Sequence, residues 1–201
     1  PRTLKYATDN FLFWHRSQTS NEWAFALATI LIETISDADT HYFFKCINGN
    51  TQSYSEIASL LLPYIFLHYY ALNPTEEVND FIVNEFNYIF DIVRGRKVLN
   101  QISEDELGFR VLADLHFAKQ KKDVKSKDGL QSKPIKVACK VAKLIFDVLD
   151  FFTSYLCHTQ QDEDLVILRT IQNFLNLFPN DVLAEVSFKC GEYHRAFIYF
   201  E

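Results

Sequence analysis

The 201-residue sequence predicts an all-α protein in which antiparallel helix pairs stack as an irregular α-solenoid. Most of the chain carries apolar residues at the i, i+3, i+4 and i+7 spacing of one helix face, whereas alternating patterns bounded by hairpin turns are scarce. Capping residues mark repeated helix starts. No strict sequence period accompanies them, so the repeats are of a degenerate, HEAT- or TPR-like kind, and a single irregular bundle is the competing architecture.

The predicted helices begin in the N-terminal third of the chain. A first helix carries Leu4, Phe11, Leu12 and Trp14, and Ser20 is the predicted N-cap of a second helix that reaches Ile35. The next helix starts at a capping box, in which Ser53 and Glu56 satisfy each other's free backbone donors, and it ends near Leu72. Its Pro63 removes one internal hydrogen bond and is expected to kink or break it.

A short turn separates this helix from the next one. Asn73 is the predicted N-cap, Pro74 suits the first helical position, and Glu76 favours the positive end of the helix dipole. The following helix spans residues 78–93 and ends at Arg94 and Gly95. Because the connection is so short, the two helices are expected to form an antiparallel hairpin.

The second half begins with a weaker helix after a capping box at residues 103–106, and continues with a Lys-rich linker or loop at 121–133. A long helix starts at Pro134 and extends to about residue 160. Asp162 and Asn180 are the predicted caps of two further helices, separated by a break at Pro179. Gly191 ends the second of these, and another helix follows.

Composition narrows the function classes. The chain is 48% hydrophobic and 23% charged with five Gly, which excludes a disordered or collagen-like protein. The apolar run at residues 57–72 is too short to span a membrane and contains a proline. Four scattered Cys without a Cys-x-x-Cys pair predict a reduced, intracellular protein.

The absence of Met and a helical pattern still running at residue 201 indicate a piece of a longer chain.

The net charge of −6 is unevenly distributed, since residues 119–143 hold nine lysines against two aspartates. Such a block attracts phosphates, so direct nucleic-acid binding is one interpretation. No aromatic side chain or arginine lies among the lysines as a base-stacking or bidentate site requires. We therefore prefer a solvated loop.

The sequence predicts no catalytic, cofactor-binding or metal-binding residue in this segment. Its isolated glycines form no phosphate-binding loop, and its six histidines never fall at zinc-like spacing. Cys157 and His158 are adjacent on a helix and point about 100° apart, which does not favour a shared ion. Acidic pairs lie in predicted first helical turns, where they stabilise the dipole. Three residues, Ser17, Thr51 and Thr159, precede glutamine and are candidate sites for a glutamine-directed kinase.

The last forty residues carry a recognisable pattern. A helix with Phe174 and Leu175 ends at Pro179, a second contains Leu183-Ala184 and Ser187, and a third contains Tyr193 and Arg195-Ala196. This pattern resembles the start of the FAT domain in the ATR branch of the phosphatidylinositol 3-kinase-related protein kinases. Leu62-Pro63-Tyr64 and the long helix after Pro134 look like the helical repeats that precede that domain.

The resemblance implies a division of the chain and a function for the parent protein. It implies a helical-repeat segment at 1–120, the last long helix before the FAT domain at 134–160, and a truncated FAT start at 162–201. The parent would be a nuclear serine/threonine kinase that uses ATP with Mg or Mn and signals DNA damage and replication stress. It would act on Ser/Thr-Gln substrates, form homodimeric assemblies and bind an ATR-interacting partner, with no membrane contact.

In this interpretation the segment is a scaffold and its important residues are structural. Pro63 and Pro179 act as breaks, Asn73 and Pro74 form a hinge turn, and Tyr193 with Arg195 anchors the last helix. Two alternatives stay open at this point. One is the scaffold of another superfamily member, either a target-of-rapamycin kinase, which usually has lysine in place of Arg195, or a pseudokinase adaptor. The other is a free-standing helical adaptor.

Overall fold

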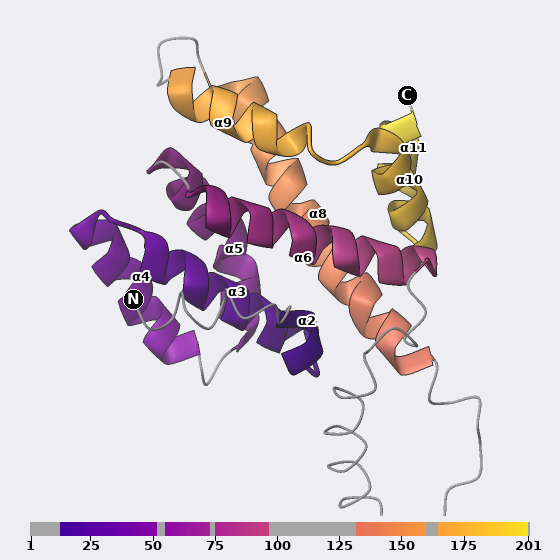
Figure 1. Cartoon of the computed structure of the whole chain (residues 1–201), viewed down its shortest axis with the longest axis horizontal. Coiled ribbons are helices and arrows are strands. Elements are labelled where there is room, and N and C mark those ends of the chain that lie inside the picture. The colour runs from indigo at the N-terminus through magenta and orange to yellow at the C-terminus, as the bar shows by residue number, and fades with distance from the viewer. Residues whose placement is uncertain (1–12, 52–54, 73–74, 97–131, 160–164, 201) are drawn as a thin grey trace, which may run out of the picture.

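A computed structural model describes residues 13–51, 55–72, 75–96, 132–159 and 165–200. All regular secondary structure within these ranges is helical, which confirms the all-α prediction (Figure 1). The described helices are α2 (Phe13–Arg16), α3 (Ser20–Thr34), α4 (Ala38–Thr51), α5 (Ser55–Ala71), α6 (Glu76–Arg94), α8 (Ser132–His158), α9 (Leu165–Leu175), α10 (Asn180–Lys189) and α11 (Tyr193–Phe200).

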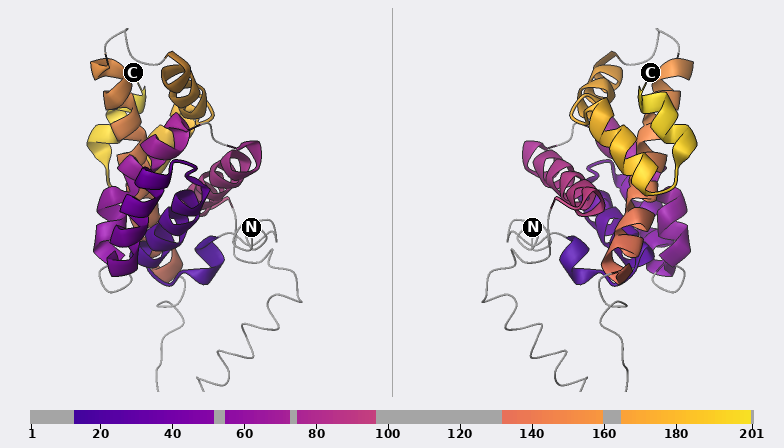
Figure 2. Two further views of the ribbon diagram at one scale, coloured as in Figure 1. Left: turned by 90° about the vertical axis from the view of Figure 1, so that its left-hand side faces the viewer. Right: turned by 90° about the vertical axis from the view of Figure 1, so that its right-hand side faces the viewer.

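The long helix α8 is the central element of the fold. It contacts α3 and α5 in the N-terminal half, α6 beside it, and α9 and α10 in the C-terminal half. Figure 1 shows α6 crossing in front of α8, with α3, α4 and α5 on one side and α10 and α11 on the other. The two side views show the same stacking of helices along α8 (Figure 2). This arrangement confirms a stacked, solenoid-like all-α architecture.

An aromatic cluster joins the two halves of this stack. Phe66 of α5 is fully buried, and its ring centroid lies 5.9 Å from that of Phe86 on α6 and 6.4 Å from those of Phe152 on α8 and Phe174 on α9. Phe178, just after α9, also contacts Phe86 at 5.8 Å. One continuous core therefore holds four helices, and removing a single ring from it should cost about 3–5 kcal/mol.

The helices predicted to form a hairpin, α5 and α6, contact each other through side chains. The Tyr70 hydroxyl donates to Asn79 Oδ1 at 2.5 Å near the turn, and Phe66 meets Phe86 farther along both helices. These contacts fit the predicted antiparallel hairpin, although α5 packs mainly against α3 and α8. Gly95 ends α6 as predicted, with a φ of 74° that favours glycine.

Three predicted caps are one or two residues out of position. Thr19, not Ser20, caps α3, and its side chain accepts a hydrogen bond from Glu22 N at 3.1 Å. Pro179 precedes α10, so Asn180 is the first helical residue and not the cap. Thr75 takes the N-cap position of α6 that was predicted for Asn73. In each case a neighbouring residue with extended backbone angles occupies the boundary.

The prediction that Pro63 breaks its helix is wrong. Helix α5 runs through Pro63 from Ser55 to Ala71. Leu62, Ile65 and Phe66 are all buried on the core face beside it, so packing holds the helix across the missing hydrogen bond. Helix α4, which packs against α3 and α5, was not predicted from the sequence.

Several predicted features lie outside the described residues. They are the first helical residues Leu4, Phe11 and Leu12, the cap residue Ser53, the turn residues Asn73 and Pro74, the weaker helix after residues 103–106, the loop at 121–131 and the cap residue Asp162. Helix α8 begins at Ser132, two residues before the predicted start at Pro134.

Candidate functional site

The described residues carry neither a metal site nor a membrane-spanning helix. No group of three or more His, Cys, Asp and Glu side chains within them is placed to hold a metal ion. None of the described helices is both long and apolar enough to cross a membrane. The candidate site is instead a surface at which the C-terminal helices bind the rest of the stack.

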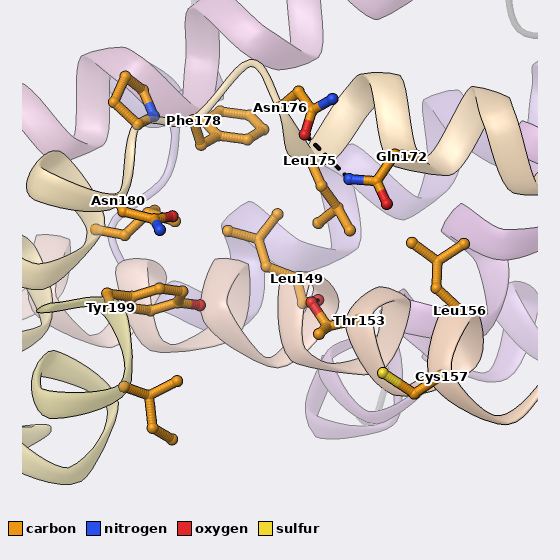
Figure 3. Close-up of a pocket in the computed structure, with 13 residues that line it drawn as sticks. Leu149, Thr153, Leu156, Cys157, Gln172, Leu175, Asn176, Phe178, Asn180 and Tyr199 are labelled. Carbon is orange, nitrogen blue, oxygen red and sulfur yellow. Dashed lines mark hydrogen bonds between the residues drawn. The ribbon is translucent and has the colours of Figure 1, made fainter. Parts of the chain in front are cut away.

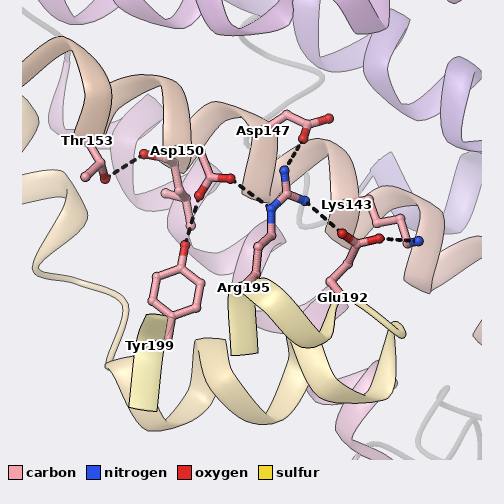
Figure 4. Close-up of polar contacts among 8 residues, drawn as sticks. Lys143, Asp147, Asp150, Thr153, Glu192, Arg195 and Tyr199 are labelled. Atoms are coloured by element: carbon pink, nitrogen blue, oxygen red, sulfur yellow. Dashed lines mark hydrogen bonds and ion pairs between the residues drawn. The ribbon is translucent and has the colours of Figure 1, made fainter. Parts of the chain in front are cut away.

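The first part of this surface is a polar seam between α8 and α11 (Figure 4). On α8 the contributing residues are spaced so that they share one face. We define the α8–α11 seam as Lys143, Asp147 and Asp150 of α8 with Glu192, Arg195 and Tyr199. Glu192 directly precedes α11 and the last two belong to it.

Arg195 is the centre of the seam. Its Nε donates to Asp150 Oδ2 at 2.8 Å and its Nη2 to Asp147 Oδ1 at 2.6 Å. Its guanidinium carbon also lies 5.7 Å from the ring centroid of Phe146, within cation–π distance. One arginine thus contacts two carboxylates one helical turn apart, which fixes both the position and the rotation of α11 on α8.

The electrostatics keep the seam charged. Burial on its own would lower the pKa of Arg195, but the carboxylates of Asp147 and Asp150 outweigh it and raise that pKa. Lys143 Nζ lies 2.5 Å from Glu192 Oε1, and this contact raises the pKa of Lys143 and lowers that of Glu192. Burial raises the pKa of Tyr199, whose hydroxyl donates to Asp150 Oδ1 at 3.3 Å. The seam is therefore formed throughout the physiological pH range.

A second ionic group attaches α10 to the end of α6. The Arg94 side chain is only 7% exposed, and its Nε donates to Glu185 Oε2 at 2.7 Å. Lys189 Nζ donates to the Arg94 carbonyl at 2.7 Å and lies 3.1 Å from Glu185 Oε1. Together with the seam, this group ties the α10–α11 pair to two different helices.

The outer face of the α10–α11 pair is apolar. Tyr193, Phe197 and Phe200 lie at i, i+4 and i+7 on α11 and are 66%, 62% and 72% exposed. Phe188 of α10 is 61% exposed and its ring contacts that of Tyr193 at 5.5 Å. We call these four residues the α11 outer face. It forms a contiguous apolar surface of the kind that marks an interaction site.

A groove lies beside the seam, between α8, α9 and the α10–α11 pair (Figure 3). It has a volume of about 650 Å³ and a floor that includes Leu149 and Leu175. Amide side chains line it, and Gln172 Nε2 donates to Asn176 Oδ1 at 3.0 Å across one turn of α9. The lining contains no Asp, Glu, His, Lys or Arg side chain, and its titratable groups are Cys157 and Tyr199.

A buried carboxyl group connects the N-terminal helices. Glu85 of α6 is fully buried, and its Oε1 accepts from the Trp23 indole N–H at 2.7 Å and from Trp14 N at 2.9 Å. Desolvation raises the pKa of Glu85 from 4.5 to about 7, although both hydrogen bonds favour the charged form. Through these two hydrogen bonds Glu85 joins α2 and α3 to α6.

The residues that the sequence singled out as structurally important do not all belong to the α8–α11 seam. Pro179 separates α9 from α10 as expected, with a φ of −62°. Arg195 is central to the seam, whereas Tyr193 lies on the exposed outer face. Sequence reasoning missed Asp147, Asp150 and Glu185, because their partners lie 45 residues or more away in the chain. Of the lysine-rich block, Lys143 is engaged with Glu192, and residues 119–131 lie outside the described ranges.

Comparison with known proteins gives a consistent result. Residues 111–201 match the family model described as serine/threonine-protein kinase ATR, M-HEAT region. A curated relative, the serine/threonine-protein kinase ATR of Drosophila melanogaster, is 28% identical over 208 residues, which cover 90% of this chain. The chain spans only 8% of the length of that relative. No solved structure matches the chain.

The matched region bears on the predicted domain division. The M-HEAT match continues to residue 201 and so includes the residues 162–201 that the sequence analysis assigned to the start of a FAT domain. Helices α8 to α11 share one core with α5 and α6, and the Arg94–Glu185 ion pair joins α10 to α6, which is the packing of consecutive repeats. The exact boundary between repeat segment and FAT domain stays a prediction.

Proposed function

We propose that this ATR-type helical segment is a non-catalytic scaffold within a large serine/threonine protein kinase, in which it holds adjacent helical segments in fixed positions. The observation that carries the proposal is the reversed polarity of α11. Arg195 and Tyr199 face α8, whereas Tyr193, Phe197 and Phe200 face outward. A helix in a free-standing domain normally has the opposite orientation, with the apolar face inward.

The reversed polarity has a simple explanation in a solenoid. Each repeat buries its apolar face against the next repeat, so an inner repeat on its own exposes one such face. The α11 outer face is then the surface on which the following helical segment of the same kinase packs. The relative's much greater length, of which this chain corresponds to 8%, supports the presence of such a segment in the parent protein.

The activity of the parent protein follows from the same relationship. We infer that the parent transfers phosphate from ATP, with Mg or Mn, to protein substrates at Ser/Thr-Gln sites. We also infer a nuclear location, signalling of DNA damage and replication stress, homodimeric assembly and an ATR-interacting partner. Two observations support these inferences: residues 174–196 resemble the start of the FAT domain of ATR-type kinases, and the Drosophila relative is named as an ATR kinase. The catalytic groups would lie in another part of the parent chain.

The test uses the full-length protein and a Ser-Gln peptide. Phosphorylation of the peptide should require ATP and a divalent ion, and should be lost when the catalytic aspartate of the kinase domain is replaced. The double variant Phe197→Asp/Phe200→Asp places two charges on the α11 outer face and should lower the kinase activity several-fold. His194→Asp adds a charge at an exposed position on the same helix and is the matched control.

The outcome separates the scaffold proposal from its alternatives. A full-length protein that lacks kinase activity would contradict the parent assignment and favour an adaptor. Normal activity and normal proteolytic resistance in the Phe197→Asp/Phe200→Asp variant would mean that nothing packs on the α11 outer face, and the scaffold proposal would then lose its basis.

A further inference from the structure

We propose that Cys139 and Cys190 are an oxidisable dithiol, which a hydroperoxide converts into an intramolecular disulfide between α8 and the end of α10. The two residues are 51 positions apart in the sequence, and no spacing motif connects them. The fold brings them together beside the α8–α11 seam. This inference concerns a modification site and does not depend on the kinase assignment.

The geometry places the two thiols in contact. Cys139 lies on α8 and Cys190 is the C-cap residue of α10, and their side chains are hydrogen-bonded to each other. Both are partly buried and pack against the edge of the hydrophobic core. Cys46 and Cys157, by contrast, are exposed on α4 and α8. Among the four cysteines, the pair of Cys139 and Cys190 is thus placed to react internally.

Contacts on both sides of the pair hold it in place. Lys143, one turn after Cys139 on α8, pairs with Glu192, two residues after Cys190. Lys189, the residue before Cys190, donates to the Arg94 carbonyl at 2.7 Å. The turn between α10 and α11 is therefore fixed on α8, with Cys190 beside Cys139.

The local charges give the two thiols different roles. The hydrogen bond from Cys190 lowers the pKa of Cys139 to about 7, against the opposing effect of burial, and the Lys143 ammonium group acts in the same direction. The same hydrogen bond, together with burial, raises the pKa of Cys190. A thiolate is the reactive form of cysteine, so Cys139 is the attacking residue and Cys190 the resolving one.

The reaction balances in two steps. The Cys139 thiolate attacks one oxygen of hydrogen peroxide, the O–O bond breaks, and the departing hydroxide takes up a proton to form water, which leaves a sulfenic acid on Cys139. Cys190 then loses its proton and attacks the Cys139 sulfur, and the displaced hydroxide takes up a proton to form a second water. The two sulfurs together lose two electrons and the peroxide gains them.

The experiment maps disulfides in the intact protein after brief exposure to hydrogen peroxide at neutral pH. Free thiols are blocked, and the protein is digested with trypsin without reduction. Cleavage after lysine and arginine releases Cys139 on the peptide 137–140 and Cys190 on the peptide 190–195. We expect these two peptides joined, with a mass lower by two hydrogens than their sum, as the main oxidation product within this chain.

Controls separate a built site from random oxidation. The same treatment in urea should remove the preference for this pair, since an unfolded chain brings its cysteines together without selectivity. Cys190→Ser should leave a sulfenic acid on Cys139 that dimedone labels, whereas Cys139→Ser should leave Cys190 unmodified. Cys46→Ser/Cys157→Ser should retain the joined peptide.

Two results would overturn the proposal. One is oxidation of Cys46 and Cys157 at the same rate as Cys139 with no joined peptide. The other is a joined peptide that forms equally well in urea. Because the wild-type mapping requires no substitution, both results are readable even if a cysteine variant folds poorly.

Discussion

The buried carboxyl of Glu85 should make the stability of this chain depend on pH in an unusual direction. Its pKa in the folded protein is raised to about 7, above the ordinary value of 4.5, because the group is desolvated. The folded state therefore keeps its proton up to about pH 7, whereas the unfolded state loses it near 4.5. As the pH rises between these values, the unfolded state is favoured by proton release, and the free energy of unfolding falls.

The size of the effect follows from the two pKa values. The interval from 4.5 to about 7 corresponds to about 3 kcal/mol of lost stability, fully developed above pH 7. Glu85→Gln keeps an oxygen that accepts from Trp23 and Trp14 but cannot ionise. The variant should therefore lack this part of the pH dependence. From pH 5 to pH 8 it should lose about 2.5 kcal/mol less stability than the wild type.

The assay is urea unfolding followed by circular dichroism at both pH values. The free energy of unfolding of each protein is compared between the two pH values. Any pH-independent effect of the glutamine amide group on stability therefore cancels. Glu77→Gln makes the same chemical change at an exposed position on α6 and should leave the pH dependence of the wild type intact. If wild type and Glu85→Gln lose the same stability from pH 5 to pH 8, Glu85 is ionised in the folded protein and the reasoning fails.

Three further predictions concern other parts of the fold, each checked by the same unfolding assay. Arg195→Ala should cost about 2–4 kcal/mol, because Asp147 and Asp150 lose their shared partner, and its effect should shrink at high salt. Gly95→Ala should cost about 1 kcal/mol, because its φ of 74° disfavours a side chain although no atom blocks one. Pro63→Ala should stabilise the chain by about 1–3 kcal/mol, since it restores a hydrogen bond within α5. A loss of stability in the Pro63 variant would mean that the ring's packing outweighs the missing bond.

The sequence predicted most helices because their apolar periodicity reports directly on burial. The long helix α8 is the clearest case, since Val141, Ile145, Val148 and Phe152 recur on one face and all four are fully buried. Helix α4 was missed because exposed Tyr42 and Phe43 break the apolar pattern. The start of α4 does carry a signal in the sequence, namely an N-cap residue. Asp37 Oδ2 accepts a hydrogen bond from Thr40 N at 2.8 Å, as an N-cap does.

The start of α3 shows a similar limit. Thr19 and Glu22 have the Thr-x-x-Glu spacing of a capping box, and Glu22 Oε2 accepts from Gln18 N at 2.8 Å. Ser20 is as favourable an N-cap residue as Thr19, so the preference for N-cap residues alone did not locate the start of α3. A search for the full four-residue pattern would have placed the cap correctly.

The candidate site was out of reach of sequence reasoning for a different reason. Periodicity shows which residues share a helix face but not which distant face they meet. Arg94 and Glu185 are 91 residues apart, and Trp23 and Glu85 are 62 apart. Asp150 lies on the long predicted helix after Pro134, and its partners, Arg195 and Tyr199, come from another helix. Such pairs are properties of the tertiary structure.

The orientation of α11 connects these observations to the scaffold function. Buried Ala196 lets α11 approach closely, while Arg195 and Tyr199 beside it hold the helix on α8 by directional bonds. Hydrophobic contact alone would have favoured the opposite rotation, with Phe197 and Phe200 inward. The seam thus uses charge pairs to keep the larger apolar surface free for a neighbouring segment. A scaffold needs this property, because each helical layer must bind the preceding one and still present an apolar face to the next.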